Sequence, residues 1–335
     1  MRLRAFFCLV VVLCTPAFGQ EPVPLLTAPE AVALVSARAG SLTGAVTAPA
    51  TVHGHPAFTL SGKATNGPVD AVIDAQAARV TTISINGKES YTWPGIVAVG
   101  HRGTLKFAPE NTIAAFNKAI ELGADLLEMD IRETKDGQLV IMHDANIVRT
   151  TSQRGNVAEL TLAEIKEADA GVKYNPANAG EKVPTFAEVL KAIEGRALPD
   201  IDFKAGDPQK VIDAVRNAGL IGKVTLFCGD WPKMHATLAI EKGFMVRPTA
   251  PKGLEGLESV LKEFDPPIVN IDWKFFSEKL VREIHLAGKL AFVNMMGNED
   301  TEAGMVRAIE AGADYIQSDR LDILVPLLRA RGLHR

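Results

Sequence analysis

Two histidines and a pair of carboxylates stand where apolar stretches of this chain end. His101 and Arg102 directly follow one short apolar run, Glu128 and Asp130 lie two residues apart in a second, and His143 follows a third. Side chains two apart on a strand point the same way, so these carboxylates repel unless a cation lies between them. Carboxylate oxygens favour a hard divalent ion, Mg²⁺ or Ca²⁺. Two histidines that exchange protons beside such an ion and an arginine suit phosphodiester cleavage.

Two further apolar stretches carry polar residues near their ends. Asp200, Asp202 and Lys204 alternate along one of them, and Asp272 ends another. A Glu-x-Asp pair is often an ordinary feature in which one carboxylate forms a salt bridge and the other is solvated. That interpretation loses weight here because the stretch 126–131 is otherwise apolar. All these groups form one site only if the stretches that carry them end at a common edge.

The rhythm of the chain from residue 96 onward predicts such an edge. Short β-branched stretches alternate with amphipathic segments, several closed by glycine, such as 112–122, 185–193, 208–218, 277–287 and 303–311. Eight stretches are predicted strands: 96–100, 126–131, 199–204, 224–228, 244–248, 268–272, 290–294 and 314–318. This alternation is typical of an α/β fold of the (β/α)8 TIM barrel type, whose active site lies where the strands end. The rival, a doubly wound sheet, lacks support because no glycine-rich phosphate loop opens a helix.

One more predicted strand, 139–142, follows Asp136-Gly137 too closely for a parallel crossover. It therefore predicts an antiparallel β-hairpin after the second strand. A two-residue turn centred on Asp136 and Gly137 pairs residue 135 with 138 and Asp130 with His143. The hairpin would thus return His143 to the level of the carboxylates.

The first 92 residues have a different composition. Residues 1–19 combine a basic start, an apolar run and small residues near Gly19, which predicts a signal peptide and an exported protein, periplasmic or extracellular. The apolar run is too short for a stable membrane anchor. Residues 20–92 predict a small α+β domain, with a helix over 29–38, three strands near 57–60, 69–73 and 80–85, and a linker at 91–95. This order faintly resembles a PepSY-like module.

Composition narrows the function classes. Lys and Arg number 36 against 40 Asp and Glu, a net charge of −4, and no basic run alternates with aromatic residues, so nucleic-acid binding is not expected. The charged fraction of 23% and the apolar fraction of 47% predict a packed globular protein. In "HGH", His53 and His55 have no clear third metal ligand, so they are interpreted as surface residues.

The motifs from residue 100 onward resemble the glycerophosphodiester phosphodiesterase family, barrel relatives of the phosphatidylinositol-specific phospholipases C. The resemblance is carried by "GHRG", "APENT", "LLEMDIRETKDGQLVIMHD" and "RTT", and by "DYIQSDRLD" near the C-terminus. It implies that His101 and His143 are the acid/base pair, that Arg102 binds phosphate, and that Glu128 and Asp130 hold a divalent cation.

The chain departs from the family pattern at two places. The family usually has Glu-x-Lys where "IDFK" supplies Asp202 and Lys204, so Asp202 is expected to bind the ion directly or through water, and Lys204 to bind substrate. Asp200 faces the same way and is a further candidate for this task. Near the C-terminus the family commonly has a Trp-Thr-Val-Asn strand, and its tryptophan often lines the pocket for the leaving alcohol. This chain has "FVNMMGNED" there instead. The alcohol preference therefore stays open.

Three residues near the motifs have alternative roles. Asn111 either caps the helix beginning near Thr112 or serves the site, with capping preferred. Glu110 either contacts the substrate glycerol or positions Arg102. Asp144 either orients His143 or bonds the local backbone.

The resemblance implies a secreted, metal-dependent phosphoric diester hydrolase. It would convert a small-molecule glycerophosphodiester to sn-glycerol 3-phosphate and an alcohol. One alternative is an enzyme of the same fold acting on lysophospholipid or sphingolipid diesters, against which the sequence shows no obvious apolar lip or membrane-binding helix. The other is a non-catalytic glycerophosphodiester-binding protein, which would not need two histidines.

Overall fold

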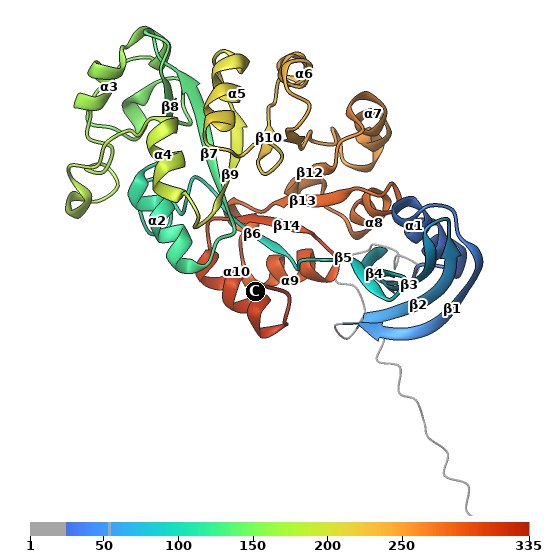
Figure 1. Cartoon of the computed structure of the whole chain (residues 1–335). Coiled ribbons are helices and arrows are strands. Elements are labelled where there is room, and N and C mark those ends of the chain that lie inside the picture. Colours follow the sequence, from blue (N-terminus) through green and yellow to red (C-terminus); the bar gives the residue numbers. More distant parts are fainter. Residues whose placement is uncertain (1–24, 53–54, 335) are drawn as a thin grey trace, which may run out of the picture.

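A (β/α)8 barrel forms the larger part of the chain, as predicted. The computed structural model describes residues 25–52 and 55–334 (Figure 1), so the predicted signal peptide and His53 lie outside the described residues. The eight parallel strands run in the order β11-β10-β9-β7-β6-β14-β13-β12. Their bounds are β6 Val97–Gly100, β7 Leu126–Glu133, β9 Leu198–Phe203, β10 Thr225–Phe227, β11 Met245–Val246, β12 Ile268–Asp272, β13 Leu290–Asn294 and β14 Tyr315–Ser318. A parallel bridge between Thr249 and Asn270 joins the two ends of this order, which closes the barrel.

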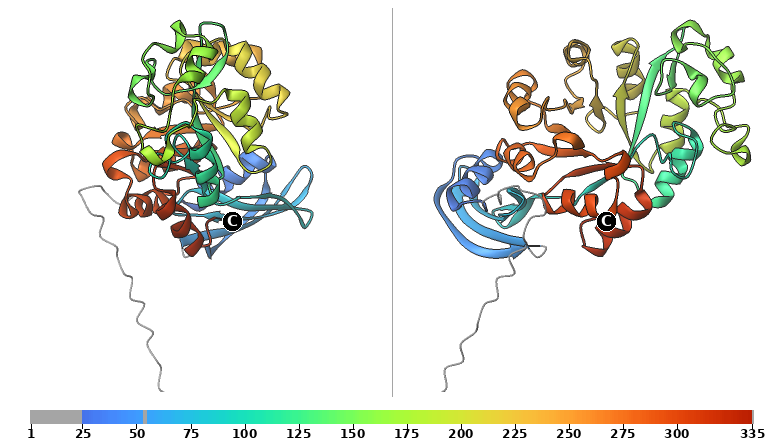
Figure 2. Two further views of the ribbon diagram at one scale, coloured as in Figure 1. Left: turned by 90° about the vertical axis from the view of Figure 1, so that its left-hand side faces the viewer. Right: turned by 180° about the vertical axis from the view of Figure 1, so that it is seen from behind.

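Helices on the outside of the barrel cover the strands (Figures 1 and 2). They are α2 Ile113–Leu122, α4 Phe186–Ile193, α5 Pro208–Asn217, α6 Trp231–Ile240, α7 Leu254–Phe264, α8 Glu278–Leu286, α9 Glu302–Glu310 and α10 Leu321–Ala330. The short helix α3 Leu162–Glu167 instead packs through Ile165 in a separate apolar cluster with Val140 and Met142. Hydroxyl side chains begin several of them: Thr112, Thr185, Ser277 and Thr301 each accept a hydrogen bond from the third residue of the helix that follows. These caps explain why the predicted helix starts lie within a residue or two of the observed ones. Among the described residues, none of the helices is both long and apolar enough to cross a bilayer.

The predicted hairpin is present, but its predicted register is wrong by one residue. Strand β8, Leu139–Ile141, pairs with β7 so that Ile131 faces Ile141, and the N–H of Met142 donates to the carbonyl of Asp130 at 2.8 Å. The turn has three residues instead of two, because the N–H of Thr134 donates to the carbonyl of Gln138 and Gly137 takes a left-handed φ of 79°. Asp130 therefore faces Met142, and His143 lies one residue further on.

A five-stranded antiparallel sheet and one helix precede the barrel. The helix is α1 Ala28–Ala39, and the strands, in sheet order, are β1 Thr43–Val52, β2 His55–Ala64, β3 Gly67–Asp74, β4 Arg79–Ile85 and β5 Lys88–Thr92. The prediction of three strands was too low, and β5 takes the first two residues of the predicted linker. The exposed edge strand β1 is built from Thr, Ala, Gly, Val and Pro, so it lacks the large apolar residues that mark a buried strand. The resemblance to PepSY-like modules stays a prediction.

This sheet packs beside α8 and α9 (Figure 1), and a buried ion cluster joins the two parts. Arg79 of β4 donates to Asp314 at 3.2 Å and to the carbonyl of Gly312 at 3.1 Å. His285 of α8 contacts Asp314 through Nε2 at 2.7 Å and the carbonyl of Ala77 through Nδ1. Both ring nitrogens of His285 thus face oxygen atoms. Burial raises the pKa of Asp314. The charge of His285 and its hydrogen bond, together with the charge of Arg79, outweigh burial and lower this pKa to about 2.

Candidate active site

Three carboxylates predicted as metal ligands lie together at the carboxyl end of the barrel strands. Glu128 and Asp130 come from β7 and Asp202 from β9, and one oxygen of each lies within 4.8 Å of the others. The parallel register pairs Asp130 with Asp202, which brings the two strands' inward-facing side chains to the same level. The first two carboxylates are buried, with exposed fractions of 2% and 0%.

The electrostatics of this cluster fit a bound cation. Burial, followed by the charge of Asp130, raises the pKa of Glu128 well above its usual range. Burial also raises the pKa of Asp202, and the ammonium of Lys204 opposes that effect. Asp130 Oδ1 is buried and accepts no hydrogen bond. A buried, unsatisfied carboxylate oxygen beside two further carboxylates is the donor set that Mg²⁺ and Ca²⁺ prefer.

Two cationic side chains face the carboxylates, as expected of phosphate-binding groups. Lys204 Nζ lies 2.6 Å from Asp202 Oδ2 and 3.2 Å from Asp130 Oδ1. Arg102 donates through NH1 to Glu110 Oε1 at 2.9 Å, and its Nε lies 3.4 Å from Asp130 Oδ2 without forming a hydrogen bond. Glu110 therefore holds Arg102 in place, as the second of the two roles left open for it requires.

His101 stands at the end of β6 and pairs with a carboxylate from the last barrel strand's end. Its Nδ1 lies 2.7 Å from Asp319 Oδ1. The N–H of Asp319 donates to Asp300 Oδ2 at 2.6 Å, and Ser318 donates to the other Asp300 oxygen at 2.6 Å. A carboxylate on Nδ1 holds that atom's proton and leaves Nε2 for proton transfer. The sequence interpretation placed Asp319 within a family motif but gave it no role.

His143, which follows the second strand of the hairpin, also has an aspartate beside its Nδ1. Its Nδ1 lies 2.6 Å from Asp144 Oδ1, so Asp144 orients the ring. Arg149 donates to the other oxygen of Asp144 and, with two further bonds of 2.8 Å, to Glu110. Hydrogen bonding to Arg149 and His143 lowers the pKa of Asp144 to about 2. Because Glu110 also binds Arg102, one chain of ion pairs joins His143 to Arg102.

The backbone around "GHRG" is bent into left-handed conformations to build this site. Arg102 has φ 51° and Gly103 φ 83°, and a Cβ on Gly103 would lie 2.7 Å from the backbone of Ala115. The turn aims the N–H of Arg102 at Glu128 Oε2, 2.8 Å away. A non-glycine residue at positive φ costs roughly 1–2 kcal/mol, so the contacts of Arg102 stabilise a strained turn.

Asn111 belongs to the site, and the preferred capping interpretation was wrong. The helix α2 is capped by the Thr112 hydroxyl, which accepts from Ala115 at 3.2 Å. The Asn111 side chain, held at φ 57°, instead donates to Asp130 Oδ2 at 2.7 Å. It thereby fixes the orientation of a carboxylate in the cluster.

Two predicted candidates do not join the site. Asp200 points into the barrel below the cluster, where Arg247 binds both its oxygens at 2.7 and 2.8 Å and Thr225 donates to it at 2.6 Å. A carboxylate neutralised in this way is not free to share a metal ion. Asp272 accepts from the N–H of Lys274 and pairs with its ammonium at 2.7 Å, so it caps the turn after β12.

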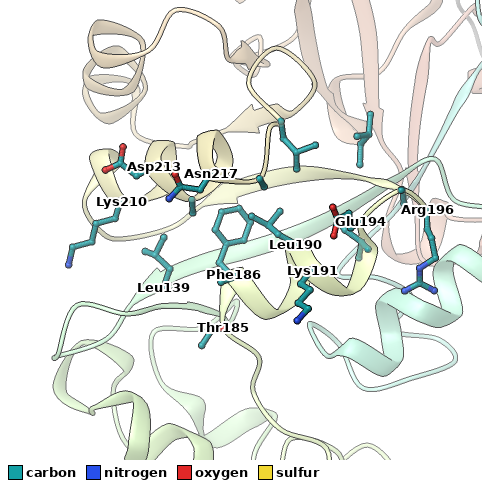
Figure 3. A pocket seen from close by; sticks show the side chains of 18 of the residues that line it. Leu139, Thr185, Phe186, Leu190, Lys191, Glu194, Arg196, Lys210, Asp213 and Asn217 are labelled. Carbon is teal, nitrogen blue, oxygen red and sulfur yellow. The ribbon is translucent and has the colours of Figure 1, made fainter.

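A large pocket lies elsewhere, between α4 and α5 on the outside of the barrel (Figure 3). Its volume is about 1140 Å³, Phe186 and Leu190 line its floor, and Lys191, Lys210 and Asp213 stand at its rim. None of the candidate catalytic or metal-binding residues lines it. The candidate site therefore rests on the residues at the strand ends.

Fold and site together define a (β/α)8 barrel with a cluster of three carboxylates and two histidine–aspartate pairs at the carboxyl ends of its strands. The model of the glycerophosphoryl diester phosphodiesterase family matches residues 101–225. A solved glycerophosphodiester phosphodiesterase from Agrobacterium tumefaciens is 30% identical, with a TM-score of 0.63, over 69% of this chain and 99% of that one. The chain belongs to the glycerophosphodiester phosphodiesterase family.

Curated relatives match part of the chain at higher identity. A glycerophosphodiester phosphodiesterase from Caldanaerobacter subterraneus is 49% identical over 111 residues, 33% of this chain and 46% of the relative. One from Bacillus subtilis is 37% identical over 158 residues, 43% of this chain and 54% of the relative. The chain thus spans about half the length of the curated relatives it matches. A phosphodiesterase from Oleispira antarctica, solved with the product sn-glycerol-3-phosphate, shares the fold at 21% identity, with a TM-score of 0.62 over 70% of this chain and 97% of that one.

Proposed function

We propose that this protein is a metal-dependent phosphodiesterase that hydrolyses glycerophosphodiesters to sn-glycerol 3-phosphate and an alcohol. The observation that carries the proposal is the pairing of His101 with Asp319 and of His143 with Asp144, at 2.7 and 2.6 Å, beside the carboxylate cluster. Mere binding of a diester needs no pair of oriented proton-transfer groups, which speaks against a non-catalytic binding protein.

In the proposed mechanism each residue has a defined task. Glu128, Asp130 and Asp202 hold the divalent cation, which when bound neutralises charge on the phosphoryl oxygens. Arg102 and Lys204 bind the phosphate and the charge that develops on it. One histidine accepts the proton of the attacking hydroxyl, which is the glycerol 2-hydroxyl or water. The other protonates the departing alkoxide, and the two exchange roles if a cyclic phosphate is formed and then hydrolysed.

The reaction is tested by release of sn-glycerol 3-phosphate from glycerophosphocholine, glycerophosphoethanolamine and glycerophosphoglycerol, with and without Mg²⁺ or Ca²⁺. We expect metal-dependent release that His143→Ala abolishes. The matched control is His235→Ala. His235 lies on α6, away from the carboxylate cluster, and its Nε2 lies 2.7 Å from Glu263 Oε1. Equal release by His143→Ala and the native protein would refute the assignment, and no release from any diester would refute the proposed substrates.

We further propose that the protein is exported and acts in the periplasm or the extracellular space. The support is the sequence of residues 1–19, with a basic start and an apolar run before Gly19. Fractionation of cells that express the native chain tests this location. Exclusive recovery of an uncleaved chain from the cytoplasm would contradict it.

A second candidate, an enzyme for lipid-sized diesters such as lysophospholipids or sphingolipids, gains support from one feature. The sequence interpretation counted the lack of an apolar lip against it. In the folded chain, however, Phe107, Val148, Val172 and Tyr174 are exposed on segments beside the catalytic groups.

A further inference from the structure

Exposed large apolar side chains gather at one end of the barrel. Over residues 97–334, all of them except Leu198 and Ile240 lie in segments that follow the carboxyl end of a barrel strand or the hairpin. They are Phe107, Val148, Val172, Tyr174, Leu254, Phe275 and Met296, with exposed fractions between 36% and 41%. Single exposed apolar residues are normal on protein surfaces, but their concentration on one face marks an interaction site.

Four of these residues lie on three segments that hydrogen bonds hold together, and we call them the apolar lip: Phe107, Val148, Val172 and Tyr174. The hydroxyl of Tyr174 donates to the carbonyl of Lys106 at 2.9 Å, which brings Tyr174 beside Phe107. Lys173 Nζ donates to the carbonyl of Val148, which brings Val172 and Tyr174 beside Val148. Three segments far apart in the sequence thus present their apolar side chains together.

The apolar lip is continuous with the catalytic groups. Arg149, next to Val148, binds Glu110 and Asp144, and these two carboxylates position Arg102 and His143. A molecule or surface that contacts the lip therefore lies at the entrance to the proposed phosphate site.

Two lysines lie beside the apolar lip, although the whole chain carries −4. Lys106 precedes Phe107, and Lys173 lies between Val172 and Tyr174. Neither lysine has a carboxylate within ion-pair distance in the described part of the chain. The nearby carboxylate of Asp169 accepts from the backbone N–H groups of Gly171, Val172 and Gly180, not from either lysine. Apolar side chains beside lysines whose charge no carboxylate neutralises are the pattern of surfaces that bind anionic lipids.

We propose that the apolar lip docks on the surface of an anionic phospholipid assembly and presents lipid-borne diesters to the site. Phe107 and its apolar neighbours enter the headgroup region, while Lys106 and Lys173 meet the lipid phosphates. This favours lysophospholipids held in a lipid surface as a substrate class. The substrate assignment rests on the proposed function, whereas the docking itself does not.

The test is cosedimentation of the full-length protein with vesicles of phosphatidylcholine, with and without phosphatidylglycerol. The variants are Phe107→Ser with Val172→Ser, and Lys106→Gln alone. The matched controls are Val46→Ser, on the N-terminal sheet, and Ile240→Ser, at the end of α6 that is opposite the mouth. We expect the double variant to bind vesicles containing phosphatidylglycerol about tenfold or more weakly. We expect Lys106→Gln to bind a few-fold more weakly at low salt, with both controls unchanged.

Hydrolysis of soluble glycerophosphoethanolamine by the same preparations separates this proposal from the proposed function. The lip variants are expected to retain it, which also shows that they fold. Loss of vesicle binding with soluble activity retained supports docking, and docking without any hydrolysis would refute only the proposed function. The docking proposal is overturned if the native protein does not bind vesicles. It is also overturned if binding is equal without phosphatidylglycerol, or if the double variant binds as the native protein does. Loss of activity on monomeric lysophospholipid without vesicle binding would instead make the lip a site for the lipid tail.

Discussion

Removing the charge of Asp314 should weaken the contact between the N-terminal sheet and the barrel. In Asp314→Asn, the Arg79 guanidinium and the His285 ring stay buried, 3.2 and 2.7 Å from a side chain that is no longer charged. Removing one partner of a buried ion pair costs about 3–5 kcal/mol. The lowered pKa gives a second measure: a fall from the usual value near 4 to about 2 corresponds to about 2.5 kcal/mol. We therefore expect a loss of about 2–4 kcal/mol at pH 7.

The same reasoning fixes the pH dependence. The folded state binds protons at Asp314 more weakly than the unfolded state does, so this group stabilises the fold fully above about pH 4. That contribution disappears as the pH falls towards 2, the pKa of Asp314 in the folded state. The difference in stability between the native protein and Asp314→Asn is thus expected to shrink steadily below pH 4.

The assay is denaturant unfolding of both proteins between pH 7 and pH 3. Asp265→Asn is the control, because the Asp265 side chain is 84% exposed and its ion pair with Lys289 should contribute less than about 1 kcal/mol. A loss below about 1 kcal/mol at pH 7, or a difference between native and Asp314→Asn that does not change between pH 7 and pH 3, would refute the reasoning.

Three further predictions concern the barrel. Asp319→Asn should lower kcat about 10²- to 10⁴-fold through loss of the His101 orientation, with KM changed only a few-fold and with Asp322→Asn near native in steady-state kinetics. Arg247→Met should cost about 3–5 kcal/mol in denaturant unfolding because it leaves Asp200 buried without a counter-charge, and adding Asp200→Leu should restore most of the loss. Glu128→Gln should weaken Mg²⁺ or Ca²⁺ binding about tenfold or more in calorimetry, and unchanged affinity would contradict the ligand set.

The sequence could predict the barrel because its strands and helices have distinct periodicities. All eight predicted strands overlap observed ones, since buried parallel strands are nearly continuous apolar stretches. The cluster of Glu128, Asp130 and Asp202 was also predictable. Their alternation on two strands fixes their common direction, and adjacent parallel strands bring them to one level.

Features that depend on one local bond, or on contacts between distant segments, were not predictable. The hairpin register turns on whether Gly137 is the second or third residue of its loop, and "DG" fits both. The role of Asp319 follows from its position beside His101, 218 residues away in the chain. The apolar lip combines residues that are isolated in the sequence, so no single stretch has an apolar pattern that reveals it.

The charges of the barrel interior indicate why a cation would stabilise the carboxylate cluster. Among the four carboxylates on the inner side of β7 and β9, Asp200 is neutralised by the bidentate Arg247 below the site. Lys204 lies between two of the others. The remaining one, Glu128, has the backbone N–H of Arg102 as its hydrogen-bond donor in the described structure, and burial raises its pKa well above the usual range. A divalent ion would supply the missing positive charge beside Glu128. Because Arg247 and Lys204 lie beside the other three carboxylates, Glu128 is the one whose ionisation would depend most on the metal.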